Sequence, residues 1–266
     1  MLEVGHRGGW LVAVAGVVLV ALAGSARAES SLRLPLPEHF GTISASTYDE
    51  NQRRVGDAHV VFEDLGDSRV RLLLASGIDG GARTVATAEF AVVDGGEHLQ
   101  LLTEESRSFD PDGLPLGVLR IDHERGVGSC NTPRDGGMKR VNVDLPEEDR
   151  VANIPLNLLF QPLVEGTTDE VNFQLLLCRF GARLVDIDAV VASREAEDPV
   201  VEVEYRPDFG VLVSAVAKKW LPRLSMWFDR SGSNHWIAHR VPLYSKGPNV
   251  FVIRDGVPRS WLGLGN

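Results

Sequence analysis

Period-two alternation of apolar and charged residues is the sequence feature that most constrains the fold. Val70, Leu72 and Leu74, for example, alternate with arginines. A β-strand points successive side chains to opposite faces, so this pattern predicts strands with one face in a core and the other in water. The alternation occurs in residues 69–74, 119–124, 185–191 and 201–206.

Clusters of Gly, Asp and Asn separate these segments. Such residues tolerate the backbone conformations of tight turns, and strands at this spacing are typical of a barrel or sandwich built as a meander. We therefore predict an all-β, mainly antiparallel chain that forms a curved meander sheet or an incomplete barrel. The predicted turns lie at residues 49–52, 77–81, 94–96, 110–113, 134–137, 230–234 and 246–248.

Two short segments favour helices rather than strands. Residues 154–160 carry a proline suited to a helix's first turn and then run apolar, and Pro162 is expected to end this helix. In residues 211–220, one helical stripe of apolar side chains is followed by lysines that suit the helix dipole. We expect both helices to plug the open face of the sheet.

The N-terminus is typical of a cleavable secretory signal peptide covering residues 1–28. An apolar run of 14 residues precedes Ala26 and Ala28, the small-residue pattern that signal peptidase accepts. The alternative is an uncleaved membrane anchor, but a spanning helix needs about 20 apolar residues. With no cysteine near the cut to carry a lipid, we expect a periplasmic or secreted protein with no membrane span after cleavage.

The remaining chain is predicted to hold one domain. Residues 29–40, with Pro35 and Pro37, are expected to form an extended N-terminal arm, and residues 41–266 a single β-rich domain without repeats. The full chain has a net charge of −10 at pH 7 and shows no compact basic patch in the sequence. Such a field repels a nucleic acid, so we expect no nucleic-acid partner.

The two cysteines, Cys130 and Cys178, are expected to form a disulfide, because thiols outside the cytoplasm most simply pair. Two alternatives stay open from the residues alone. Both thiols could be free and buried, or Cys130 could act as a nucleophile with a nearby histidine base.

The other candidates for chemistry are histidines and paired carboxylates. His235 and His239 have the spacing of a zinc helix but lie in a strand-like run, where they would be about 13 Å apart, so no metal site is expected. His123 is on the apolar phase of its strand, either as a satisfied core histidine or as a general base. Residues 104–105 and 147–149 are interpreted as solvated acidic loops.

Aromatic residues gather in the last fifth of the chain. They could line the concave face of a curved sheet as an apolar pocket, or they could simply fill the core. The candidate ligand-binding residues are Trp220, Trp227, Phe228, Trp236 and Tyr244, and Phe251 belongs to the same group.

The order of segments resembles exported bacterial proteins of unknown function whose twisted, incompletely closed barrels are similar to periplasmic lipoprotein carriers. The resemblance covers residues 41–257 and is carried by residues 48–56, 155–160 and 224–229. It implies an antiparallel sheet around an apolar cavity that is plugged by helices and holds an acyl chain.

Three functions follow as hypotheses. The first is a non-enzymatic periplasmic protein that binds a lipid or another apolar small molecule, with no cofactor. The second is a structural or interaction module of the cell envelope, whose protein partner the sequence does not name. The third is a hydrolase that acts through Cys130 or His123.

Overall fold

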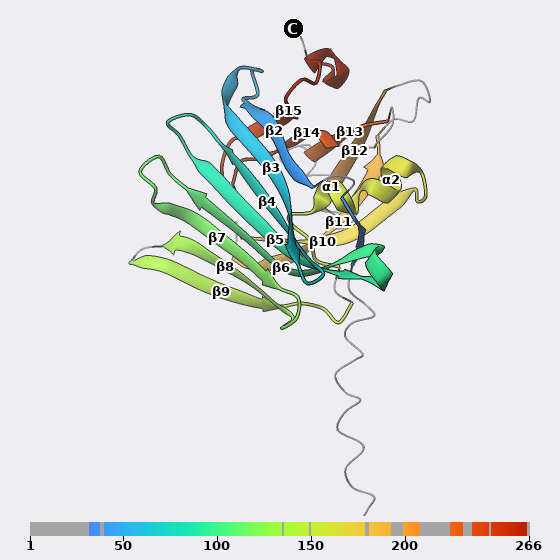
Figure 1. Ribbon diagram of the computed structural model, residues 1–266. Coiled ribbons are helices and arrows are strands. Elements are labelled where there is room, and N and C mark those ends of the chain that lie inside the picture. Colours follow the sequence, from blue (N-terminus) through green and yellow to red (C-terminus); the bar gives the residue numbers. More distant parts are fainter. Residues whose placement is uncertain are drawn as a thin grey trace, which may run out of the picture.

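The chain forms a single curved sheet that does not close into a barrel (Figure 1). The computed structural model describes residues 32–37, 40–134, 136–148, 150–178, 181–192, 199–207, 224–230, 236–244 and 246–264. Within these ranges the sheet has fifteen strands. Its pairings are antiparallel apart from one parallel bridge between Val151 and Gln174. The predicted fold class is therefore confirmed.

The strands follow the alternating segments of the sequence, and most are six or more residues long. They are β1 (Arg33–Pro35), β2 (Gly41–Tyr48), β3 (Arg54–Gly66), β4 (Arg69–Gly77), β5 (Arg83–Val93), β6 (His98–Phe109), β7 (Pro115–Asp122), β8 (Val127–Arg134), β9 (Gly137–Asp144), β10 (Glu170–Leu177), β11 (Arg183–Val191), β12 (Val200–Pro207), β13 (Leu224–Asp229), β14 (Trp236–Pro242) and β15 (Asn249–Arg254).

Two meanders make up the sheet. After β1, the chain enters the middle of the sheet at β2 and steps outward, strand by strand, to β9 at one end. It then crosses to β10 at the opposite end and steps back to β15, which pairs with β2. The two strands that end the sheet, β9 and β10, are therefore consecutive in the sequence, and only the segment between them links the two ends along the chain.

That crossing segment carries two short helices, α1 (Leu156–Leu159) and α2 (Gln161–Glu165). The first predicted helix is thus present as α1, but it ends at Leu159, before Pro162 is reached. Pro162 lies in the first turn of α2, where its missing N–H has no partner to lose. The second helix, α2, ends at Glu165 and is followed by Gly166, whose φ of 73° is left-handed.

The structure describes only some of the segments for which the sequence makes further predictions. Residues 1–28 and the predicted helix at residues 211–220 lie outside the described residues. From the predicted arm, Arg33–Pro35 forms β1 and pairs with the start of β6. No helix within the described ranges is long and apolar enough to cross a membrane.

The two faces of the sheet have separate cores. The concave face is lined by one apolar cluster that extends from β1 to β13 and includes the inward side chains of α1 and α2. On the other face, Trp227, Phe251 and Ile253 pack with Val257 and Leu262 of the C-terminal segment. This segment contains the short 3-10 helix η2 (Arg259–Leu262).

A disulfide connects the two ends of the sheet. Cys130 on β8 is bonded to Cys178, the residue after β10, with 5.4 Å between their Cα atoms. Beside it, a Cβ on Gly128 would lie 2.9 Å from Leu176 of β10, so glycine gives this leucine its room. The predicted Cys130–Cys178 pair is therefore confirmed, and it spans the gap that backbone pairing leaves open.

Removing this disulfide should destabilise the fold substantially. The bond joins residues 48 apart, which on the chain-entropy model is worth about 4 kcal/mol. We expect the double variant Cys130→Ala/Cys178→Ala to lose about that free energy of unfolding in urea titrations. Reduced wild-type protein serves as the matched control and should unfold near the variant. Equal urea midpoints for oxidised wild type and the variant would contradict a stabilising role.

Candidate functional site

The inside of the curve is occupied by the α1–α2 pair, which we call the plug (Leu156–Glu165). It lies against the concave face beside β11 and β12 (Figure 1). Phe160, between the two helices, is fully buried, and its ring lies 5.8 Å from that of Phe173 and 5.4 Å from that of Tyr205. The plug therefore fills apolar space that a ligand would otherwise contact.

A buried carboxylate holds the segment that leads into the plug. Oε2 of Glu104, on β6, accepts the backbone N–H groups of Asn153 and Ile154, each at 2.8 Å. Its Oε1 lies 3.3 Å from Nε2 of His123, and the side chains of Glu104 and His123 are 0% and 6% exposed. A carboxylate that accepts backbone N–H groups makes strong, charge-assisted hydrogen bonds. Glu104 thus anchors the segment that leads into the plug to β6.

The interpretation of Glu104–Glu105 as a solvated loop is wrong, because both residues lie on β6 and Glu104 is buried. Leu102 is the extra residue of a bulge between β5 and β6, because Phe90 pairs with Leu101 and Glu89 with Thr103. A bulge shifts the alternation by one residue, which turns Glu104 to the core face. Of the second acidic stretch, Glu148 is exposed and pairs with Arg150, and Asp149 lies outside the described residues.

Asn153 continues the anchor from Glu104 to β10. Its side-chain amide donates to the carbonyl of Leu176 at 3.0 Å, and its Oδ1 accepts the N–H of Leu176 at 2.9 Å. The neighbouring backbone also pairs with Gln174 on both its N–H and its carbonyl. Residues 150–153 therefore cover part of the outer edge of β10 and bind it to the Glu104 anchor.

Glu104 and His123 form a pair that the sequence alone does not reveal. The alternation correctly places His123 on the core face, but its partner is neither Asp122 nor Glu124. It lies across the strand pair, because Glu104 pairs in register with Ile121, two residues before His123. The doubled Leu101–Leu102 was the one available signal of the bulge.

A second buried polar pair lies further along the interior. The hydroxyl of Tyr205 (β12) lies 2.6 Å from Nε2 of His239 (β14). Burial lowers the pKa of His239 to about 4 and raises the pKa of Tyr205. A neutral imidazole can accept a hydrogen bond from the phenol O–H group of Tyr205. This hydrogen bond therefore favours the uncharged form of His239.

The aromatic residues of the last fifth of the chain do not share one face. Phe228 points into the concave cluster, whereas its neighbour Trp227 packs under the C-terminal segment on the other face. Tyr244 belongs to a third cluster, and Trp236 packs against both this cluster and the concave one. Trp220 lies outside the described residues, and the ligand-binding role of the group stays a prediction.

The candidates for catalysis and metal binding are also placed. Cys130 is consumed by the disulfide, so it offers no thiolate nucleophile in this state. His239 lies on β14, and His235 falls outside the described residues. Among the described side chains, no three His, Cys, Asp or Glu gather closely enough to hold a metal ion.

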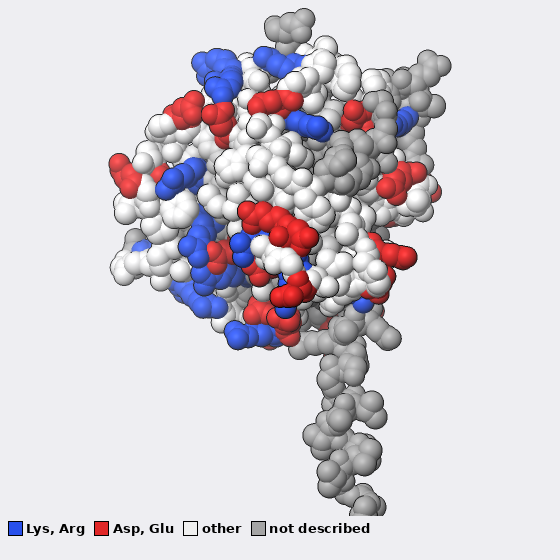
Figure 2. Space-filling model, in the orientation of Figure 1, with Lys and Arg blue, Asp and Glu red and all other residues white. Residues whose placement is uncertain are grey.

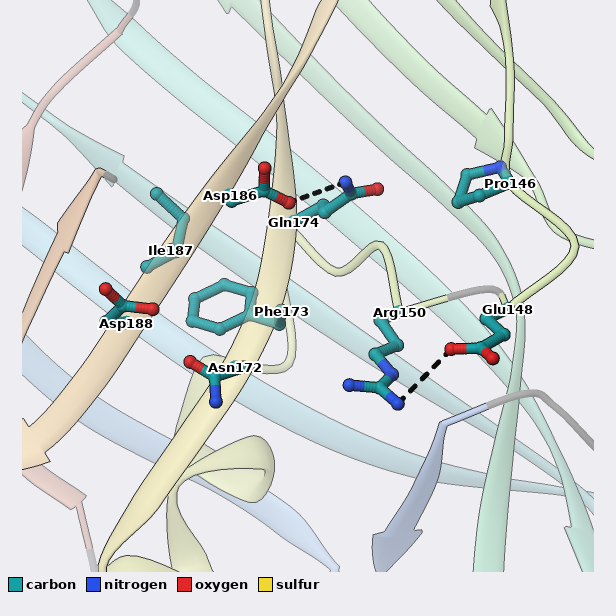
Figure 3. Close-up of a pocket in the computed structure, with 9 residues that line it drawn as sticks. All are labelled: Pro146, Glu148, Arg150, Asn172, Phe173, Gln174, Asp186, Ile187 and Asp188. Atoms are coloured by element: carbon teal, nitrogen blue, oxygen red, sulfur yellow. Dashed lines mark hydrogen bonds and ion pairs between the residues drawn. The ribbon is translucent and has the colours of Figure 1, made fainter. Parts of the chain in front are cut away.

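A shallow hollow of about 250 Å³ lies on the surface of β10 and β11, next to the crossing segment (Figure 3). Gln174 donates to Asp186, and Arg150 pairs with Glu148, whereas Oε1 of Gln174 is buried and has no hydrogen-bond partner among the described residues. The lining combines these polar groups with the apolar side chains of Pro146, Phe173 and Ile187.

Comparison with known proteins finds a distant likeness to a solved structure. No family model matches the chain, and no curated protein matches it. One solved structure, a "Beta-barrel-like Protein of Domain of Unknown Function DUF1849 from Brucella abortus", is 12% identical, with a TM-score of 0.42 over 84% of this chain and 97% of that one. At this level of similarity no site or activity is transferred.

The lowered pKa of His239 predicts a pH dependence of stability. Its pKa falls from the ordinary histidine value of 6.5 to about 4 in the folded protein, so the unfolded chain takes up this proton first as pH falls. Stability should therefore fall between pH 6.5 and pH 4, by at most about 1.4 kcal/mol per pH unit from this group.

Urea titrations across this range would measure the effect against His239→Gln as control, since glutamine can accept from Tyr205 but does not titrate. The free energy of unfolding of the variant should therefore change less between pH 6.5 and pH 4 than that of the wild type. The same slope in both proteins would show that His239 does not carry it.

Proposed function

We propose that this protein is an exported, non-enzymatic protein of the cell envelope that binds an acyl chain or a similar apolar ligand on its concave face. The observation that carries the proposal is the size of the apolar concave cluster relative to its cover. The cluster extends over strands from both meanders, whereas α1 and α2 contribute only four and five residues. A cover this short over a large apolar surface suits a site that opens for a ligand.

The plug has few hydrogen bonds of its own to stabilise its helices. Neither helix has a side-chain hydrogen bond at its N-cap. Helices this short are unstable alone, so packing and the Glu104 anchor must hold them in place. When the plug leaves the concave face, the apolar contacts of Leu158, Phe160 and Leu163 are lost. A ligand that makes new apolar contacts there offsets this loss of free energy by roughly 0.8 kcal/mol for each CH₂ that it buries.

Export and the lipid-carrier resemblance belong to the same proposal. The disulfide suits an oxidising compartment, and the first 28 residues have the sequence of a signal peptide. Like the lipoprotein carriers that the sequence resembles, the protein would hold an acyl chain inside a curved sheet and release it when the plug returns.

The test is ligand extraction followed by probe binding. Protein purified after export, with its disulfide intact, is extracted with organic solvent, and the extract is analysed by mass spectrometry. The delipidated protein is then titrated with a fluorescent fatty acid. We expect a bound lipid in the extract and saturable binding of the probe.

Glu104→Gln provides the sharper comparison, with Glu105→Gln as matched control. Replacing the carboxylate by an amide weakens the two hydrogen bonds to Asn153 and Ile154, so the plug opens more often. The probe should bind several-fold more tightly to Glu104→Gln and as in wild type to Glu105→Gln. Folded proteins that carry no lipid and bind no probe would refute the proposal.

An interaction module of the cell envelope is the second candidate. It is favoured by a different observation, the exposed edge of the sheet at β9, which has both faces largely in solvent. The two functions do not exclude each other, because the concave face and this edge are different surfaces.

A further inference from the structure

β9 ends the sheet at the lower boundary seen in Figure 1. It pairs with β8 on one side, and no described segment pairs with its other side. The strand at the other end of the sheet, β10, has part of its outer edge covered by residues 150–153. The two ends of the sheet therefore differ in how much of their backbone is open. Six of the eight residues of β9 are exposed.

Pro133 shows which backbone groups of β9 point to this open side. Pro133 is paired with Met138 but has no N–H, so the two cannot form a hydrogen-bonded pair. In an antiparallel ladder, bonded and non-bonded pairs alternate. The N–H and C=O groups of Met138, Arg140 and Asn142 therefore point away from β8, ready to bond to an added strand.

β9 carries two basic side chains and one acidic side chain, Asp144, although the chain as a whole has a net charge of −10. Lys139 and Arg140 are exposed neighbours, so they lie on opposite faces of β9, and exposed Arg134 precedes the turn into it. The register places Arg107 and Arg120 on the same face as Arg140, and both of them pair with Glu105 there. Figure 2 shows blue side chains gathered over the region that Figure 1 labels β7, β8 and β9.

We propose that β9 binds an extended acidic segment of a partner protein, which adds to the sheet as a further strand. The open N–H and C=O groups supply the ladder, and Arg140 faces carboxylates on one face of the added strand. Edge strands also use such charges to prevent pairing with copies of themselves. A second copy centred on Arg140 would bring like charges together, whereas an acidic strand neutralises them.

The binding should be moderate and sensitive to salt. Backbone hydrogen bonds supply most of the affinity in strand addition, and each favourable cross-strand charge pair adds a smaller share. Charge pairs at an exposed edge weaken as salt screens them.

The test uses the full exported protein with its disulfide intact and three labelled eight-residue peptides, followed by fluorescence anisotropy. One peptide alternates glutamate and valine, one alternates lysine and valine, and one is the acidic peptide methylated at every backbone nitrogen. We expect binding of the first only, weakened about tenfold by Arg140→Glu. Arg125→Glu is the control, because Arg125 is 82% exposed in the β7–β8 turn and away from the open edge.

Three outcomes would overturn the proposal. Equal binding of the methylated peptide would mean charge attraction without a ladder. A dimer in sedimentation that dissociates in Arg140→Glu, with no peptide bound, would identify a second copy as the occupant. Binding of phosphatidylglycerol vesicles, lost in Arg140→Glu and again without peptide binding, would identify a membrane surface instead.

Discussion

The buried carboxylate of Glu104 is the interaction on which the interior of this protein depends. The sheet does not close by backbone pairing, and its end strands, β9 and β10, are joined through a crossing segment. Glu104 binds that segment at Asn153 and Ile154, and Asn153 in turn binds β10. A charged group out of contact with water must be well bonded, and here it has two backbone N–H donors and an imidazole.

From this anchor follow both the filled concave face and its proposed use. The same segment continues directly into the plug, so its attachment decides whether α1 and α2 cover the apolar cluster. The disulfide lies close to the contact between Asn153 and Leu176. It joins β8 to the end of β10 without involving the plug. The two sheet ends can therefore stay together while the plug moves, which is what reversible binding of an apolar ligand requires.

Much of the fold could be predicted from the sequence, and the site could not. Alternation alone predicts strands such as Val70–Leu74, and compartment chemistry predicts the Cys130–Cys178 pair. Glu104 escapes such reasoning, because one extra residue at Leu102 reverses the alternation, and only the partner strand reveals the bulge. The grouping of Trp227 with Phe228 overlooked that neighbours in a strand face opposite ways. The pairing of β15 with β2 leaves no local signal, since it joins segments about 200 residues apart.

Hydrogen exchange tests the central claim most directly, because it reports opening of the plug at individual backbone amides. Compared with wild type, Glu104→Gln should exchange about tenfold faster across residues 153–165, a change that corresponds to roughly 1.4 kcal/mol. The amides of β3, β4 and β5 should keep their protection in both proteins. Unchanged exchange in residues 153–165 would contradict the claim that Glu104 holds the plug, as would an equal rise across the whole sheet.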